Sequence, residues 1–164
     1  MIEINIASEI TDFMTIEKLA HEILHEVYDF FIPSKHTDNF LNEFQSASAI
    51  ESQILNKKFS YYLLVFNTKT VGYLALQEVD EKLILSKFYI LESFRGKKIG
   101  KSVFEFVFEF AKKNRLVKIE LIVKKQNKKT VDIYLKNGFK IIETITTSFL
   151  NGYSVEDYRM EKVL

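Results

Sequence analysis

The sequence predicts an α/β protein built on a mixed sheet with helices on both faces. Three observations carry this prediction. The first run alternates like a strand, long helical stripes follow it, and the second half alternates strands with helices. The chain has 164 residues, 47% of them hydrophobic, with one proline, five glycines and no low-complexity stretch or internal repeat. We therefore expect one domain, residues 1–164, with a substantial core.

The N-terminal third is predicted to contain one strand and then helices. Isoleucine occupies every second position of residues 2–6, which is typical of a strand. Apolar residues at helical spacing follow from Thr11 and stop before Pro33, which cannot continue a helix. The segment "HTDNFLNEF" is a candidate short helix. Ser48 and Glu51 have the spacing of a capping box for a further helix that reaches about residue 56.

The middle of the chain predicts three strands, at residues 60–66, 70–77 and 83–91, separated by the turn-like segments "NTKT" and "VDEK". After them, Ile99 begins a helical stripe rich in phenylalanine that is broad enough to be buried around most of its circumference. Glu105 should lie on its solvent side. The middle therefore supplies a meander of strands followed by a buried helix.

The last third predicts a strand, a helix and two final strands. "VKIELIV" (residues 117–123) is nearly continuously apolar, as expected in a sheet covered on both faces. Asn127 is a suitable N-cap for a short helix, which Gly138 ends. Residues 139–147 and 153–162 read as the closing strands.

Composition excludes several classes of function. The net charge of +1 gives no global field that would favour nucleic acid or an acidic membrane. The absence of cysteine removes disulfides, cysteine-ligated metals and cysteine nucleophiles together. No apolar stretch reaches membrane-spanning length, and "MIEINIASEI" is polar where a signal peptide would be basic and then apolar. We therefore expect a cytoplasmic protein that binds neither nucleic acid nor membranes.

The segment "RGKKIGKS" comes close to a nucleotide-binding P-loop. Residues 96–102 read G-x-x-x-G-K-S, one residue shorter than the G-x-x-x-x-G-K-[ST] motif. A P-loop protein also needs an acidic residue at the end of an apolar strand to hold magnesium. The available strand ends in lysines, and Glu120 lies in its middle. A nucleoside triphosphatase is therefore disfavoured.

A second motif, "HEILH", matches the H-E-x-x-H zinc signature at His21, Glu22 and His25. The helical stripe centres near Leu24, which places both histidines on its flank and Glu22 on the opposite side. A zinc peptidase directs all three side chains towards one cleft. We therefore expect a helix flank with partly exposed imidazoles and no metal, and a zinc peptidase is a remote alternative.

A third constellation occupies the second half. Arg95-Gly96-Lys97-Lys98-Ile99-Gly100 follows a strand and opens a helix, and a later helix begins at Asn127, carries Tyr134 and leads into Asn137-Gly138-Phe139. This pattern resembles the GNAT superfamily of acetyl-CoA-dependent N-acetyltransferases, whose phosphate loop reads [R/Q]-x-x-G-x-[G/A]. The resemblance implies a twisted, mostly antiparallel sheet of about seven strands. Lys98 departs from the pattern, because the family has glycine there and a side chain disfavours positive φ.

The resemblance implies a site for acetyl-CoA as cosubstrate, with no metal. Backbone amides at a helix N-terminus, with nearby cations, suit the phosphates of the cofactor. The matching loop positions are Arg95, Gly96, Lys97, Lys98, Ile99, Gly100 and Lys101. In the family the preceding strand is bulged and binds the pantetheine arm, which corresponds here to Phe88, Tyr89 and Ile90, and Asn127 also contacts that arm.

By the same resemblance, Tyr134 protonates the departing CoA thiolate after direct attack by a neutral amine. "LSKFYI" and "NGYSVEDYRMEK" resemble a bacterial branch near the polyamine acetyltransferases. A small-molecule amine acceptor is therefore expected, polyamine or amino-acid-like. The positions that correspond to the acceptor pocket are Tyr28, Phe31, His36 and Tyr153.

Several alternatives stay open. Family members that acetylate protein N-termini often carry Glu five residues before the asparagine, where this chain has Ile122. Glu78, Glu92 and Asp157 are candidate general bases, with none preferred. A catalytically silent acetyl-CoA-binding or regulatory module, and a protein N-terminal or lysine acetyltransferase, are the competing functions. A homodimer is also compatible with the resemblance.

Overall fold

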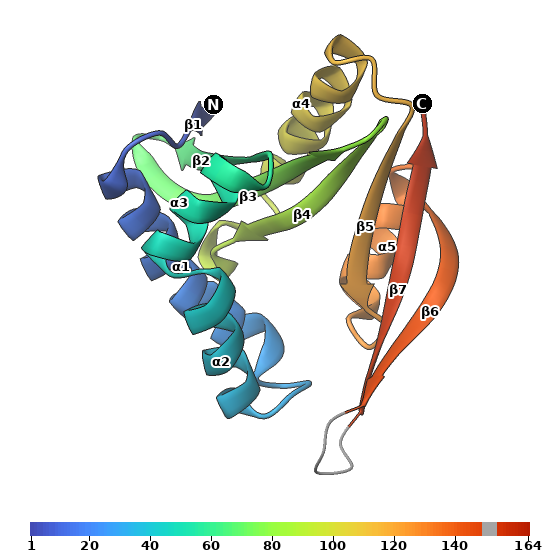
Figure 1. Cartoon of the computed structure of the whole chain (residues 1–164), viewed down its shortest axis with the longest axis horizontal. Helices are drawn as coiled ribbons and strands as arrows, with labels where there is room; N and C mark the ends of the chain where they lie inside the picture. The colour runs from blue at the N-terminus through green and yellow to red at the C-terminus, as the bar shows by residue number, and fades with distance from the viewer. Residues whose placement is uncertain (149–153) are drawn as a thin grey trace.

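The centre of the protein is one seven-stranded sheet, seen in a computed structural model that describes residues 1–148 and 154–164 (Figure 1). The strands lie in the order β1-β2-β3-β4-β5-β7-β6, and β4–β5 is the parallel pair. The strands are β1 (Ile2–Ile6), β2 (Phe59–Phe66), β3 (Lys69–Val79), β4 (Lys82–Ile90), β5 (Lys118–Lys124), β6 (Lys140–Ser148) and β7 (Ser154–Val163). The predicted mixed, mostly antiparallel sheet is confirmed.

Helices cover both faces of this sheet. They are α1 (Ile10–Tyr28), α2 (Ser34–Phe44), α3 (Ala47–Asn56), the 3₁₀ turn η1 (Glu92–Phe94), α4 (Ile99–Lys113) and α5 (Lys128–Lys136). The N-cap of α3 is Ser46, whose hydroxyl accepts a hydrogen bond from the amide of Ala49, so the predicted cap at Ser48 is wrong. Ser46 is the residue with extended backbone before the first helical turn, whereas Ser48 already lies inside that turn.

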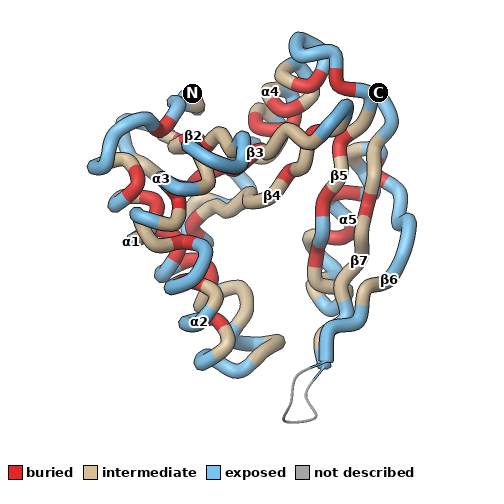
Figure 2. Tube along the Cα trace, in the orientation of Figure 1, coloured by how far each residue is buried: buried red, intermediate tan, exposed pale blue. Residues whose placement is uncertain are grey.

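Two apolar clusters hold the layers together. On one face, Ile16, Ile23 and Leu24 of α1 are fully buried with Tyr61 and Tyr73 of the sheet. The other face buries one side of α4 and of α5 against the sheet. Figure 2 shows this pattern as buried segments along the inner sides of α1 and α4. The phenylalanine-rich helix is buried along one side, with Phe106, Phe108 and Phe110 only partly covered, so the predicted burial around most of its circumference is too broad, while Glu105 is exposed as expected.

The sheet splits between β4 and β5. The two strands pair only where residues 82–84 lie beside 118–120, and beyond these pairs they diverge (Figure 1). A β-bulge in β4 accompanies the split, because Leu76 of β3 pairs with Leu85 whereas the next pair joins Ala75 to Lys87. Ser86 is the extra residue of this bulge. Such bulges re-aim a strand and commonly stand beside functional sites.

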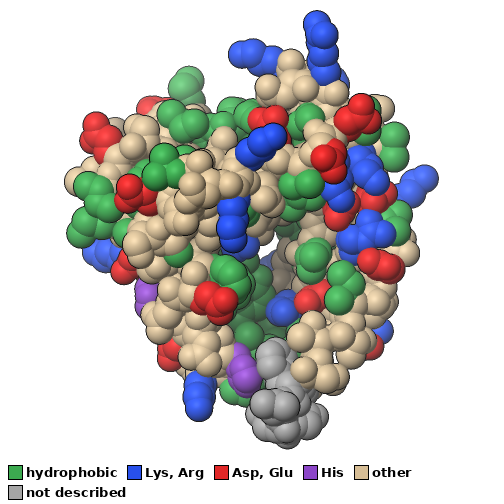
Figure 3. All heavy atoms as spheres, in the orientation of Figure 1, with side chains coloured by type: hydrophobic (Ala, Val, Ile, Leu, Met, Phe, Trp, Pro, Cys, Tyr) green, Lys and Arg blue, Asp and Glu red, His purple; other side chains and the backbone are tan. Residues whose placement is uncertain are grey.

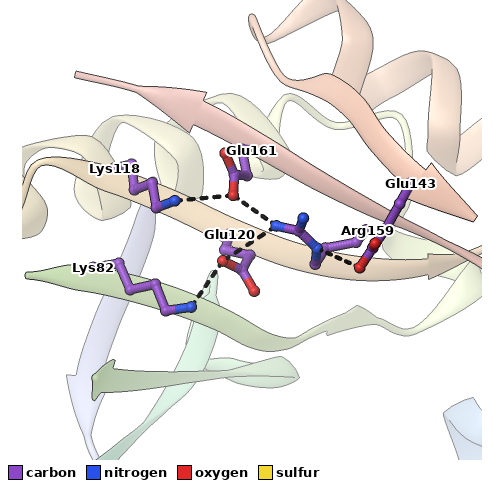
Figure 4. Close-up of polar contacts among 6 residues, drawn as sticks. All are labelled: Lys82, Lys118, Glu120, Glu143, Arg159 and Glu161. Carbon is purple, nitrogen blue, oxygen red and sulfur yellow. Dashed lines mark hydrogen bonds and ion pairs between the residues drawn. The ribbon is translucent and has the colours of Figure 1, made fainter. Parts of the chain in front are cut away.

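A network of charges crosses the face of β5 and β7 that points away from α5 (Figure 4). The Arg159 guanidinium lies 2.6 Å from the Glu161 carboxylate, 2.9 Å from that of Glu143 and 3.7 Å from that of Glu120. Lys82 of β4 reaches Glu120 at 3.0 Å. Hydrogen bonds from Lys118 and Arg159 lower the pKa of Glu161. The network therefore ties the two halves of the sheet together where they meet.

The expectation that β5 is covered on both faces is wrong. Its inward residues Ile119 and Leu121 are buried, but Glu120 belongs to the charge network and Ile122 is 60% exposed. α1, α2 and α3 cover the other half of the sheet, so this face of β5 remains open. The apolar run therefore reflects an open cleft on one side of the strand.

Candidate functional site

A cleft of about 670 Å³ lies between the diverging strands β4 and β5. The space-filling view shows the molecule hollowed there, with hydrophobic side chains in the hollow (Figure 3). Residues from α1, β4, the loop after it, α4, β5 and α5 line the cleft. They include Glu26, Tyr28, Phe30, Phe31, Ser86, Phe88, Tyr89, Ile90, Arg95, Gly96, Gly100, Phe104, Ile122, Asn127, Lys129, Thr130, Ile133 and Tyr134.

The loop between η1 and α4 carries two residues with left-handed backbone. Gly96 has φ +76° and Lys98 has φ +63°, so Lys98 adopts the conformation that its side chain disfavours. Lys98 is also the N-cap of α4, and it makes no side-chain capping hydrogen bond. The first-turn amides of α4, together with the positive end of its dipole, are thus suited to an anion beside the cleft.

Arg95 connects this loop to two other elements. Its Nε donates to the Ile90 carbonyl at 3.0 Å, and its guanidinium lies 3.7 Å from the Glu26 carboxylate of α1. The remaining predicted loop positions differ in placement. Lys97 and Lys101 are exposed, whereas the side chain of Ile99 is buried in the core. Of the predicted loop residues, Arg95, Gly96 and Gly100 line the cleft.

The β4 wall of the cleft contains the three positions expected to face the pantetheine arm. Phe88, Tyr89 and Ile90 all line the cleft, and the Tyr89 hydroxyl is 2.8 Å from that of Tyr28. Gly72 of β3 lies opposite Ile90, and a Cβ at Gly72 would overlap the Tyr89 carbonyl oxygen. Gly72 was not predicted as a site residue from the sequence, although a glycine inside an apolar strand often marks close backbone approach.

On the opposite wall, α5 presents Asn127 and Tyr134. The Asn127 side chain accepts a hydrogen bond from the Thr130 amide at 3.4 Å, so it caps α5 as predicted while it also lines the cleft. Tyr134 is buried, with its ring edge-on to Phe104 and Phe139. Burial raises the pKa of Tyr134 well above its usual value, with a smaller contribution from Tyr28. The phenol therefore keeps its proton throughout the neutral pH range.

The predicted acceptor residues are only partly brought together. Tyr28 and Phe31 line the cleft, whereas His36 of α2 is not among its lining residues, and Tyr153 lies outside the described residues. The candidate bases Glu78, Glu92 and Asp157 do not line it either. Several residues that were not predicted from the sequence do line it, among them Glu26, Ser86 and Lys129. These residues meet at the cleft because β4 diverges from β5 and because β4 is bulged. Neither feature can be recognised from the sequence pattern.

In the "HEILH" motif, His25 contacts two carboxylates. His25 Nδ1 is 2.8 Å from Asp29, and Nε2 is 2.8 Å from Asp38 of α2. The hydrogen bond to Asp29, followed by that to Asp38, raises the pKa of His25 against the opposing effect of burial. Within residues 1–148 and 154–164, no cluster of three or more His, Cys, Asp or Glu is arranged to hold a metal ion. Among the same residues, no helix has the length and apolarity to cross a membrane.

Comparison with known proteins matches this arrangement to one family. Residues 20–139 match the model of the acetyltransferase (GNAT) family. Spermidine N(1)-acetyltransferase of Thermoplasma acidophilum is 25% identical over 145 residues, which span 86% of this chain and 90% of that protein. The crystal structure of the PaiA N-acetyltransferase from Thermoplasma acidophilum in complex with coenzyme A has a TM-score of 0.82 at 23% identity, and covers 100% of this chain and 99% of that one.

The ribosomal-protein-S18-alanine N-acetyltransferase of Escherichia coli has a TM-score of 0.75 at 14% identity, covering 99% of this chain and 94% of that one. This likeness shows a shared fold. The family match spans most of the chain, including β4, the loop of Arg95 and Gly96, α4, β5 and α5, whose residues line the cleft. The chain therefore belongs to the GNAT family and is an acetyl-CoA-dependent N-acetyltransferase.

Proposed function

We propose that this enzyme transfers the acetyl group of acetyl-CoA to a primary amine of a small molecule, either a polyamine or an amino-acid-like amine. The observation that carries the proposal is the cleft itself. It brings the free edge of β4, the loop of Arg95 and Gly96, and the phenol of Tyr134 to one cavity. The resemblance to a spermidine acetyltransferase supports a polyamine as acceptor.

The cofactor would lie along the cleft in an extended form. Its pyrophosphate would sit on the amides of the first turn of α4, beside the loop of Gly96 and Lys98. The pantetheine arm would take the place of a strand beside Phe88–Ile90, where β4 has lost its pairing to β5. Asn127, on the opposite wall, would contact the same arm. A free backbone N–H at this edge would stabilise negative charge on the thioester oxygen.

Tyr134 would supply the proton that the departing thiolate needs. Burial keeps its phenol protonated, and it lines the same cleft as Phe88. The amine nitrogen attacks the thioester carbon directly, the C–S bond breaks, and the sulfur takes the phenolic proton. The proton left on the attacking nitrogen then returns to Tyr134, so that no covalent enzyme intermediate is required.

The acceptor would enter on the side of Tyr28, Phe31 and Glu26. Aromatic faces and a carboxylate are the groups that recognise an alkylammonium ion. His36 and Tyr153, which correspond to acceptor-pocket positions by the family resemblance, belong to the same proposal. A cytoplasmic location, expected from the sequence, and a homodimer, compatible with the family resemblance, also remain part of the proposal, and cell fractionation and light scattering test them.

The test is thiol release from acetyl-CoA over a panel of spermidine, alkyl diamines, amino acids and peptides. We expect turnover with at least one small amine. Tyr134→Phe should lower kcat by about 10²–10⁴-fold while leaving coenzyme A affinity and Tm nearly unchanged. Coenzyme A binding without turnover of any amine would instead indicate a silent binding module. Turnover of peptides alone would indicate a protein acetyltransferase.

A further inference from the structure

Lys87 of β4 is a half-buried lysine that the mechanism above does not use. Its Nζ donates hydrogen bonds to the Ser86 hydroxyl at 3.0 Å and to the Ser86 carbonyl at 3.2 Å. The same nitrogen lies 5.4 Å from the centre of the Phe40 ring of α2. Among the described residues, Lys87 forms no ion pair with a carboxylate. A partly buried cation without a counter-ion loses part of its hydration uncompensated, so this position calls for a functional explanation.

Ser86 connects Lys87 to the cleft. It is the extra residue of the β4 bulge, and it lines the same cleft as Phe88 and Tyr134. The bulge thus places a hydroxyl in the cleft wall, directly before the strand segment proposed to bind the pantetheine arm. The Lys87 amine lies within hydrogen-bond distance of the Ser86 hydroxyl.

We propose that Ser86 and Lys87 form the route by which the acceptor ammonium loses its proton. The inference rests on the proposed function. The ammonium N–H bond breaks as its proton passes to Ser86 Oγ, and the Ser86 O–H proton passes to the neutral Nζ of Lys87. The products are a neutral amine, an unchanged serine and a Lys87 ammonium. The second proton of the reaction, lost by the nitrogen after attack, goes to the thiolate through Tyr134.

Burial supports this role because it lowers the pKa of Lys87 to about 8. Near neutral pH a usable fraction of the side chain is then neutral and able to accept a proton. The titratable groups on the neighbouring elements include His36 and Asp38 of α2, Tyr28 of α1, and Tyr73 and Tyr89 of the sheet. Asp38 is occupied by His25, burial raises the pKa of all three tyrosines, and none of these groups contributes to the lowered pKa of Lys87.

Two neighbouring groups stabilise the Lys87 ammonium that results from this proton transfer. The Ser86 carbonyl accepts one hydrogen bond from the ammonium, and the face of Phe40 attracts a cation. Both groups hold the proton until it passes to solvent. The arrangement therefore fits a group that alternates between its neutral and charged states during each turnover.

The experiment compares wild type with Lys87→Met, which keeps the length and apolar stem of the side chain and removes the amine. Initial rates are measured from pH 6 to pH 10 with two acceptors, one with an alkylamine pKa of about 10.4 and one with an α-amino pKa of about 8. With the first acceptor, we expect Lys87→Met to lose at least about tenfold in kcat/KM near neutral pH. The loss should shrink as pH rises and the amine deprotonates in solution.

With the acceptor of lower pKa, the loss should be several-fold smaller near neutral pH and should disappear at a lower pH, because a larger share of this amine is already neutral in solution. Ser86→Ala should give the same pattern, since it interrupts the relay. Lys113→Met, at the exposed end of α4, is the matched control and should match wild type. Coenzyme A affinity and Tm of each variant report any structural damage, which would lower the rate equally for both acceptors and at all pH values.

An unchanged pH–rate profile and acceptor dependence in Lys87→Met, with wild-type turnover intact, would overturn this inference and leave the proposed function standing. A uniform loss that neither high pH nor the weaker base relieves would also overturn it, because it would assign Lys87 a structural role. A wild type that turns over no amine would overturn both.

Discussion

The close approach of β3 to β4 at Gly72 provides a sharp test of the cleft wall. In Gly72→Ala, the new methyl group would overlap the Tyr89 carbonyl oxygen and lie 3.1 Å from the Ile90 Cα. Both are backbone atoms, so no side-chain rotation relieves the overlap. β4 must move away from β3 at the segment proposed to bind pantetheine.

The magnitude follows from two opposing effects. Overpacking of this kind costs about 1–3 kcal/mol, and alanine recovers about 0.4–1 kcal/mol by restricting the unfolded chain. Because the clash is with rigid backbone, we expect a net loss near 2 kcal/mol. For a chain of this size, that corresponds to a Tm decrease of roughly 4–8 °C. Coenzyme A affinity should fall as well, since the displaced carbonyl and the neighbouring amides form the free edge of β4.

Differential scanning calorimetry and isothermal titration with coenzyme A measure both quantities. Gly100→Ala is the matched control for stability, because the nearest neighbour of its Cβ would be the Phe88 ring at 4.0 Å and alanine favours the first turn of α4. Its Tm should stay constant or rise. A Gly72→Ala protein whose Tm lies within about 1 °C of wild type would refute the packing described for this wall.

Three further predictions concern the loop, the helix pair and the charge network. Lys98→Gly should raise Tm by about 2–4 °C, because it removes the side-chain strain of a left-handed residue, which is worth about 1 kcal/mol; an unchanged or lower Tm would count against that strain. The pKa of His25 is raised, chiefly by Asp29 and then by Asp38, so its stabilisation is complete below about pH 6.5 and is lost as pH rises through the raised value. His25→Gln should therefore flatten this part of a Tm-against-pH curve, and a curve that keeps its wild-type shape would contradict the assignment. Arg159→Met should lower Tm at pH 7, and the decrease should shrink as pH falls through the lowered pKa of Glu161 and its ion pair with Arg159 is lost; a decrease that does not change with pH would show that packing is responsible.

The elements themselves could be predicted well because local patterns determine them. Alternation at residues 2–6, the stripe that begins near Thr11 and the N-cap at Asn127 each gave an element close to its observed bounds. The cap of α3 was misplaced because Ser46 and Ser48 are chemically equivalent in sequence, and only the backbone conformation distinguishes them.

The cleft was predicted less completely, because it depends on contacts between distant segments. Tyr134 and Arg95 were found through a family pattern. The contact between Arg95 and Glu26, however, joins the loop before α4 to α1, and no local sequence motif links these two segments. Ile122 was read as covered because an apolar run looks the same whether it faces a helix or an open cleft. Ser86 and Lys87 matter only because β4 is bulged, and a bulge is a property of pairing rather than of composition.

The divergence of β4 from β5 also affects how the protein behaves without its cofactor. β4 and β5 pair over only three residue pairs. Without its cofactor, the enzyme therefore has unpaired strand edges inside its cleft. Such edges are templates for pairing with other chains. A ligand that occupies this gap shields them, and at about 100 times its Kd it adds about 2.7 kcal/mol to the stability. The cosubstrate would thus stabilise the fold as well as take part in the reaction, and Tm should rise with the concentration of acetyl-CoA.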